Sequence, residues 1–260
     1  MKQDRRRFLK VLGVLSATSS AGAGLVPAEA ADGTIAAPPG TPLAAPETYA
    51  YLTAPEVSFL EAALARLIPE DELGPGAKEA GVAVFIDRQL AGEFGAMSRE
   101  YRSGPWPEGT PQQGYQSRLT PREVYRAAIA ETDERCLGLH GKRFAALEAS
   151  QQEDVLKALD EGTLSLTSAP SRTFFALLWQ NTQEGFFADP IHGGNRDKAG
   201  WRLVGFPGVA AVYTEQIEKH GVPYRVEPVS IADLRQGRAK VDAHGHPVHQ
   251  PTSAPKGSRP

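Results

Sequence analysis

The stretch from Thr53 to Pro69, TAPEVSFLEAALARLIP, decides the fold class of this chain. It opens with Thr53-Ala54-Pro55-Glu56, in which a threonine stands three residues before a glutamate and a proline occupies the first turn of a helix. Apolar side chains then recur at helical spacing until Pro69 ends the pattern. They are Val57, Leu60, Leu64, Leu67 and Ile68. The stretch therefore predicts an α-helix with one apolar side facing a core.

Two more start signals of this kind follow, Thr120-Pro121-Arg122-Glu123 and Ser150-Gln151-Gln152-Glu153, and each precedes a run with helical periodicity. Further helices are predicted over about 78–90 and 171–187. The last carries apolar residues in nearly every direction, which is typical of a helix at the centre of a bundle. Because no long alternating pattern appears before Val222, we predict an all-α fold, an irregular helical bundle with long ordered loops and little or no sheet.

The first thirty residues predict an export signal. Two arginines, one variable residue and Phe-Leu-Lys form the twin-arginine pattern. Its residues are Arg5, Arg6, Phe8, Leu9 and Lys10. The following apolar run, residues 11–26, is too short and too rich in Gly, Ser and Thr to span a membrane, and Ala28-Glu29-Ala30 supplies a cleavage site. We therefore expect a periplasmic protein, exported by the twin-arginine translocase and without a membrane span in the mature chain.

Composition divides the chain into four predicted parts: a signal peptide over 1–30, a Pro-rich linker over 31–50, a helical domain over 51–235 and a disordered tail over 236–260. The tail contains His244, His246 and His249, whose spacing could chelate a transition metal weakly. The region 222–237 is compatible with a short strand, a helix or an arm that wraps a partner.

Charge and cysteine content exclude several classes of function. Removal of residues 1–30 leaves 23 basic and 29 acidic residues, so the mature chain has a net charge near −6 and no basic cluster for nucleic acid. The single cysteine, Cys136, rules out an internal disulfide, a C-x-x-C-H haem attachment and cysteine-rich metal sites. With no nucleotide-binding motif either, we assign no catalytic, cofactor-binding or metal-binding residue to this chain and predict a buried, inert thiol.

The segment 186–208, FFADPIHGGNRDKAGWRLVGFPG, is the best candidate for a site. Its glycines permit close approach of the backbone, and its aromatic residues provide anchors that a disordered linker lacks. We interpret it as an ordered loop that presents a surface to a partner; an Ω-type loop that covers the core is the alternative. The interface candidates are Phe187, Asp189, Pro190, His192, Gly193, Gly194, Asn195, Trp201 and Phe206.

A second hypothesis gives this loop chemistry of its own. Asp189 and His192 could act as an acid/base pair or as two metal ligands in a stand-alone periplasmic enzyme or metal-binding protein. An isolated Asp-x-x-His has low specificity, however, and no third ligand is evident nearby. We keep this reading as the alternative function.

Four stretches resemble the gluconate 2-dehydrogenase subunit 3 family. They are PGAKEAGV at 75–82, FID at 85–87, FADPIHGGN at 187–195 and WRLVGFPG at 201–208, and the resemblance covers about 52–208. It implies a non-catalytic small subunit that accompanies the FAD-dependent large subunit of a sugar or polyol dehydrogenase, often with a membrane-bound cytochrome c subunit. FAD and haem c would belong to those partners. This chain would act like a chaperone, supporting folding, twin-arginine co-export and stability of the large subunit, and would meet the membrane through the complex.

Overall fold

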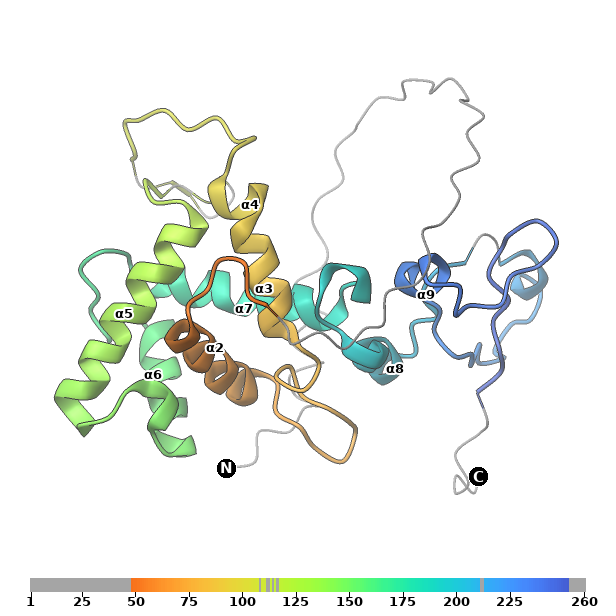
Figure 1. The fold of residues 1–260 in the computed structure, drawn as a ribbon, viewed down its shortest axis with the longest axis horizontal. Coiled ribbons are helices and arrows are strands. Elements are labelled where there is room, and N and C mark those ends of the chain that lie inside the picture. The colour runs from red at the N-terminus through yellow and green to blue at the C-terminus, as the bar shows by residue number, and fades with distance from the viewer. Residues whose placement is uncertain are drawn as a thin grey trace. The chain divides into compact units, whose positions relative to one another are not determined.

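The computed structural model describes residues 48–107, 109–110, 113, 115, 117–210 and 213–252; the regular elements among them are helices, with no extended strand (Figure 1). The predicted signal peptide and nearly all of the predicted linker lie outside these residues. The α-helices are α2 (Ala54–Leu67), α3 (Val82–Ala91), α4 (Glu93–Ala96), α5 (Pro121–His140), α6 (Ala149–Asp160), α7 (Ser171–Phe187), α8 (Ala199–Val204) and α9 (Ile231–Arg235). Short 3₁₀ turns are η2 (Phe144–Ala146), η3 (Pro190–His192), η4 (Arg196–Lys198) and η5 (Thr214–Gln216). The all-α prediction is confirmed.

The start signals of α2 and α5 work as the sequence predicts. The backbone N–H of Thr53 donates to Glu56 Oε2 at 2.7 Å, and that of Thr120 donates to Glu123 Oε2 at 2.7 Å. The prediction for α6 is wrong in detail, because Glu148 is the N-cap and its N–H donates to Gln151 Oε1 at 3.1 Å. A carboxylate therefore takes the capping position expected of a hydroxyl, and Ser150 lies inside the helix.

Two other predicted boundaries need correction, and glycines explain both. The helix expected over 78–90 begins at Val82, because Gly81 adopts a left-handed conformation with φ +73° that an α-helix does not contain. The following stretch, 92–119, is rich in Gly and Pro and its sequence therefore predicts a loop, yet it contains the short helix α4. Gly95 lets α4 lie against the end of α3, since a β-carbon there would sit 2.0 Å from the carbonyl oxygen of Leu90.

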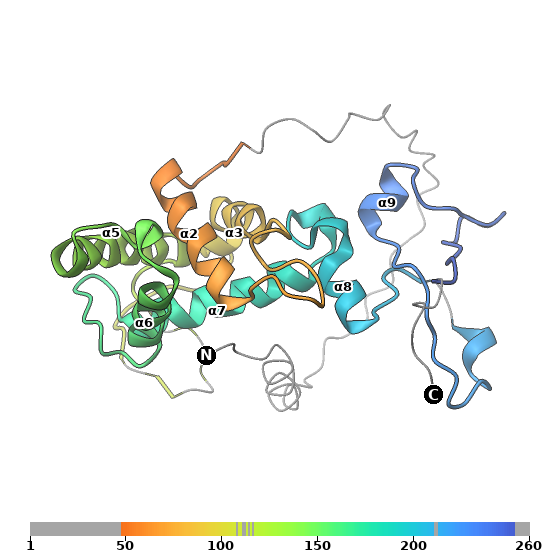
Figure 2. The same ribbon diagram turned by 90° about the horizontal axis from the view of Figure 1, so that it is seen from below.

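Helix α7 is the central element of the bundle. It contacts α2, α3, α5, α6 and α8, and Figure 2 shows it running from α6 toward α8. This confirms the prediction that the apolar helix at 171–187 is buried by its neighbours. Its Phe174 side chain is fully buried.

The core joins aromatic rings from four different elements. Phe59 of α2 lies 4.4 Å from Phe144 of η2 and 6.2 Å from Phe174 of α7, between ring centroids. Tyr125 of α5 packs edge-on against Phe174 at 5.5 Å, and its hydroxyl donates to Asn181 Oδ1 at 2.9 Å. Because the buried phenol has a partner, the tyrosine adds apolar area to the core without an unsatisfied hydroxyl.

A buried carboxylate ties the start of the domain to α3. Asp87, 1% exposed, accepts hydrogen bonds from the backbone N–H groups of Ala50, Tyr51 and Leu52 at 2.7, 2.9 and 2.8 Å. Arg126 of α5 lies over the Tyr51 ring, 4.2 Å from its centroid. The segment that enters the domain is therefore fixed before α2 begins.

The C-terminal region, residues 204–252, is an arm with little regular structure. Isolated bridges pair Gly208 with Val229, Val226 with Pro251 and Val241 with Pro247. Within 222–237, left open by the sequence, the structure places the five-residue helix α9 between irregular segments. The predicted tail starts inside this arm, and its boundary at 236 stays a prediction. None of the helices in the described residues has the length and hydropathy needed to cross a membrane.

Candidate functional site

The nine predicted interface residues differ widely in exposure. Asn195 and Trp201 are buried, with exposed fractions of 0% and 6%, and Gly194 is buried as well. His192 and Phe206 are exposed. The other four are half-buried: Phe187, Asp189, Pro190 and Gly193. Part of the predicted set therefore builds the loop from inside, and part reaches solvent.

Asn195 organises the loop that follows α7. Its side-chain nitrogen donates to the carbonyl of Ala188 at 2.7 Å, and its side-chain oxygen accepts from the N–H of Gly200 at 2.8 Å. The backbone N–H of Arg196 donates to the carbonyl of Ala80 at 2.9 Å, which connects the loop to the residues before α3. A single buried amide thus holds both ends of the segment 188–200.

Two glycines are required because the loop lies directly on the end of α7. A β-carbon at Gly194 would sit 2.2 Å from the carbonyl oxygen of Gly185, and one at Gly200 would sit 2.1 Å from that of Phe186. Real β-carbons do not approach backbone so closely. The glycine-rich composition therefore reflects backbone packing, which is the covering role of the alternative Ω-loop reading.

Aromatic residues close the loop. Trp201 donates its indole N–H to the carbonyl of Phe187 at 2.7 Å, and its ring packs edge-on against Phe206 at 5.1 Å between centroids. Phe206 remains 46% exposed. One face of this aromatic pair is therefore internal and the other is available to a partner.

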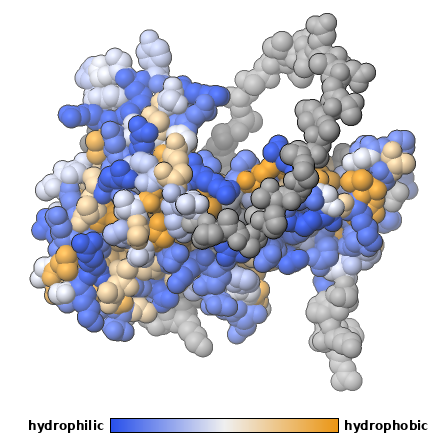
Figure 3. All heavy atoms as spheres, in the orientation of Figure 1, coloured by the Kyte–Doolittle hydropathy of each residue, from blue (hydrophilic) through white to orange (hydrophobic). Residues whose placement is uncertain are grey.

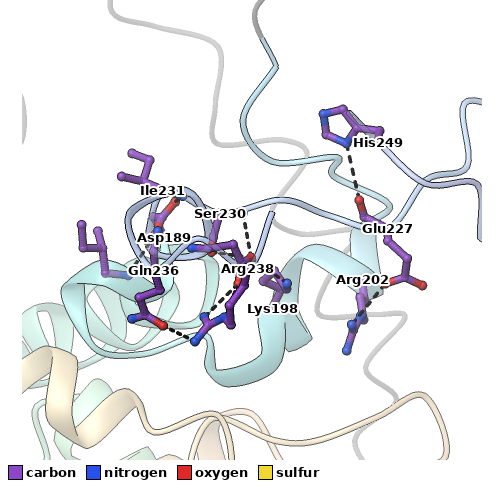
Figure 4. Close-up of polar contacts among 12 residues, drawn as sticks. Asp189, Lys198, Arg202, Glu227, Ser230, Ile231, Gln236, Arg238 and His249 are labelled. Carbon is purple, nitrogen blue, oxygen red and sulfur yellow. Dashed lines mark hydrogen bonds and ion pairs between the residues drawn. The ribbon is translucent and has the colours of Figure 1, made fainter. Parts of the chain in front are cut away.

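Asp189 is a connector between the loop and the arm (Figure 4). Its Oδ1 accepts from the N–H of Ile191 at 3.0 Å, and its Oδ2 accepts from the N–H of Ile231 at 2.7 Å. A longer contact of 3.4 Å joins Oδ1 to the N–H of Ala232. The carboxylate thus caps η3 and also satisfies N–H groups at the start of α9. Metal binding or proton transfer by Asp189 would compete with these bonds, and His192 is not among its partners.

A second carboxylate, Asp233 of α9 itself, binds three side chains, and these partners, Lys198, Ser230 and Arg238, are labelled in Figure 4. It pairs with Lys198 at 2.8 Å and with Arg238 at 2.8 Å, and it accepts from the Ser230 hydroxyl at 2.7 Å. Burial alone would raise the pKa of Asp233, yet the hydrogen bonds from Lys198, Ser230 and Arg238 outweigh it and hold the pKa well below its usual range. This cluster is not among the residues predicted from the sequence, although Ser230-Ile231-Ala232-Asp233 has the spacing of a capping box.

The contact from Lys198 also supports a strained turn. Asn195, Asp197 and Lys198 all have left-handed backbone angles, with φ of +48°, +55° and +58°. Such angles are uncommon outside glycine and persist where the surroundings fix them. Asn195 is fixed by its buried amide, and Lys198 by its ion pair with the arm.

The described residues contain no cluster of metal ligands, and their cysteine is buried. Among the residues that the structure describes, no group of three or more His, Cys, Asp or Glu side chains could hold a metal ion. Cys136 is buried in α5, and burial, together with the charge of Asp133, raises the pKa of its thiol to about 11. The prediction that this cysteine is buried is confirmed.

The sequence of the bundle and the loop matches a known protein family. Residues 54–208 match the family described as gluconate 2-dehydrogenase subunit 3, and this match includes α2 through α8 and the whole loop. The chain belongs to this family. Searches of curated proteins and of solved structures gave no significant match.

Membership in the gluconate 2-dehydrogenase subunit 3 family agrees with the resemblance found in the sequence over about 52–208, and it supports a role as an accessory subunit of a dehydrogenase complex. The matched region ends at Gly208, where the backbone pairs with Val229. The bundle and the loop are therefore the shared part of the family. The residues of the arm beyond 208 lie outside the match.

Proposed function

We propose that this chain is the non-catalytic small subunit of a periplasmic FAD-dependent dehydrogenase that oxidises gluconate, another sugar or a polyol. The family match over 54–208 carries the proposal. FAD would be held by the large subunit and haem c by a membrane-bound cytochrome c subunit. The carboxylates of Asp189 in the loop and of Asp233 in α9 fit this assignment, because both are engaged in holding the arm.

The proposed role is assembly and export of the large subunit. The twin-arginine translocase accepts folded cargo, so a leader on this chain would carry across a large subunit that is already folded and bound. Binding to the folded form alone also stabilises it by mass action, by about 2.7 kcal/mol when the free small subunit is at a hundred times its dissociation constant. Export would thereby depend on correct folding.

The export role is tested by changing the leader within the full chain. Arg5→Lys combined with Arg6→Lys removes the twin-arginine pair but keeps the charge, and Arg7→Lys at the variable position is the matched control. Each variant is co-expressed with the proposed FAD-dependent partner subunit, and dehydrogenase activity is measured in periplasmic and cytoplasmic fractions. We expect the double variant to retain the activity in the cytoplasm and the control to export it. Equal periplasmic activity in both would refute co-export.

Direct association has its own test. The mature chain is immobilised and the FAD-dependent subunit is applied, with the flavin absorbance of the bound fraction as readout. A flavin-containing complex is expected. If the isolated small subunit instead oxidised a sugar without a partner, and His192→Ala abolished that activity while the helices stayed folded, the alternative enzyme reading would replace this one.

A further inference from the structure

The arm, residues 204–252, exposes much more apolar surface than a self-sufficient segment would. In its described part, nine large apolar side chains are between 37% and 67% exposed. They are Val204, Phe206, Tyr213, Ile217, Val222, Tyr224, Ile231, Val241 and Val248. The buried side chains of its described part all come from the short stretch 228–233. Figure 3 shows apolar surface on this part of the molecule.

The helical bundle exposes fewer large apolar side chains than the arm does, although its described part is about three times as long. These side chains are distributed over a turn, α4, the loop after it and α5. They are Leu73, Phe94, Tyr101, Trp106, Leu137 and Leu139. Single exposed apolar residues are normal on any surface, whereas a concentration of them marks an interaction site. The arm is therefore the part of the chain that needs to be covered.

The arm is nevertheless held in place by polar contacts. Asp189 binds the start of α9, and the pair Lys198–Asp233 holds the same helix. Val209 and Val229 pair through a 2.8 Å backbone hydrogen bond, and His249 Nε2 lies 2.8 Å from the carbonyl of Val209. A surface that is already positioned loses less conformational entropy on binding. The exposure is thus a property of an ordered segment.

The charge of the arm limits what can cover it. Residues 204–252 contain five acidic and five basic residues, so the arm carries no net charge. Among its described residues, Glu227 forms an ion pair with Arg202, Asp233 forms ion pairs with Lys198 and Arg238, and Asp242 lies 3.3 Å from Nδ1 of His246. A basic excess that would favour nucleic acid or an anionic membrane is absent from its sequence. An apolar protein surface of low charge is the complementary partner.

From these observations we propose that the arm is the main docking surface for the catalytic subunit of the dehydrogenase, and that it binds an apolar, uncharged patch on that subunit. This inference rests on the proposed function and moves the interface from the loop, as the sequence predicted, to the arm beside it. Phe206, Tyr213 and Tyr224 supply aromatic anchors of the kind enriched at the centres of interfaces. Because the family match ends at Gly208, most of the arm is also the part that can fit this chain to its own partner.

The test compares two matched pairs of substitutions in the full mature chain. Ile217→Ser with Val222→Ser changes two arm residues that are 67% and 64% exposed, and Leu137→Ser with Leu139→Ser changes two residues of α5 that are 43% and 71% exposed. Binding of each double variant to the purified FAD-dependent subunit is measured by calorimetry, and circular dichroism checks that both variants keep their helices. Burial of two aliphatic side chains predicts that the arm variant binds about thirtyfold more weakly, with the α5 variant unchanged.

The outcomes separate this inference from the proposed function. If the wild-type chain fails to bind the FAD-dependent subunit, the proposed function fails. If the wild-type chain binds and the arm variant binds equally well, the docking inference alone is overturned. Sedimentation of the chain without partner tests a second copy as occupant, since a dimer that the arm substitutions dissociate would also overturn it. Affinity that falls steeply between about 0.05 and 0.5 M salt would contradict an uncharged interface.

Discussion

The helical bundle and the arm hold their positions by opposite means. In the bundle, Phe59, Tyr125, Phe144 and Phe174 bring four elements together in an aromatic core, and polar contacts such as the one between Tyr125 and Asn181 satisfy what is buried with them. In the arm, hydrogen bonds and ion pairs of carboxylates, together with paired backbone groups, fix the position of the chain. Most large apolar side chains of the arm face solvent. This difference is the physical basis of our proposal that the arm, and not the bundle, is covered by a partner subunit.

The largest expected effect compares two phenylalanines. Phe174→Ala removes a ring that is fully buried among Phe59 and Tyr125, and we expect a loss of about 3–5 kcal/mol in the free energy of unfolding. Phe206→Ala removes a ring that is 46% exposed in the arm, and we expect a loss below about 1 kcal/mol. Urea denaturation followed by circular dichroism measures both. Equal losses would end the distinction between the two regions.

The next largest effect on the free energy of unfolding is expected from substitution of Asp87, whose carboxylate is buried in the bundle. Asp87→Asn replaces an oxygen that accepts N–H groups from residues 50–52 with an amide that donates, so we expect a loss of about 2 kcal/mol. Proteolysis near residue 50 should accelerate. The exposed Asp154→Asn in α6 is the matched control and should change stability by less than about 0.5 kcal/mol. An unchanged Asp87→Asn protein would show that the entry segment is held by other contacts.

Substitution of Asp189 should destabilise the start of α9 in the arm and leave the stability of the bundle unchanged. Asp189→Asn weakens the hydrogen bond to Ile231 that caps α9, and loss of such a cap costs about 1 kcal/mol. We expect hydrogen exchange at the Ile231 amide to become about fivefold faster, with an unchanged urea midpoint for the bundle. The exposed Asp197→Asn serves as control. A shift of the midpoint with no change at Ile231 would place Asp189 in the core rather than at the connection.

The smallest effect is a dependence on pH of the attachment of α9 to the loop. Hydrogen bonds lower the pKa of Asp233 in the folded arm, so its contribution to the stability of this attachment is complete above the unfolded carboxylate pKa of about 3.9. As the pH falls below that value, Asp233 takes up a proton when α9 is detached from the loop but not when it is attached. The attachment of α9 therefore weakens. Amide signals of α9 should therefore stay constant from about pH 6 to 4 and change below pH 4. In Asp233→Asn this transition should disappear; a transition near pH 6 would point to a histidine instead.

The sequence by itself determined the long helices of the bundle and the family. Capping residues at Thr53 and Thr120, and apolar spacing along α2, α5 and α7, are local signals that tertiary contacts did not override. The motifs at 187–195 and 201–208 likewise led to the family without any coordinates. The structure describes none of the leader residues, so export rests on the sequence alone.

Only the tertiary structure decided what the loop residues do. The sequence placed Gly194, Asn195 and Trp201 at a partner surface, yet all three are buried. Gly194 lies against the carbonyl of Gly185, Asn195 bonds to Ala188 and Gly200, and Trp201 bonds to the carbonyl of Phe187. The sequence also could not connect Asp189 with Ile231, or Lys198 with Asp233, since those pairs are separated by 42 and 35 positions. Apolar periodicity and capping residues are signals of contacts between residues that lie only a few positions apart. The contacts that position the arm join distant ones, and they exist only once the chain has folded.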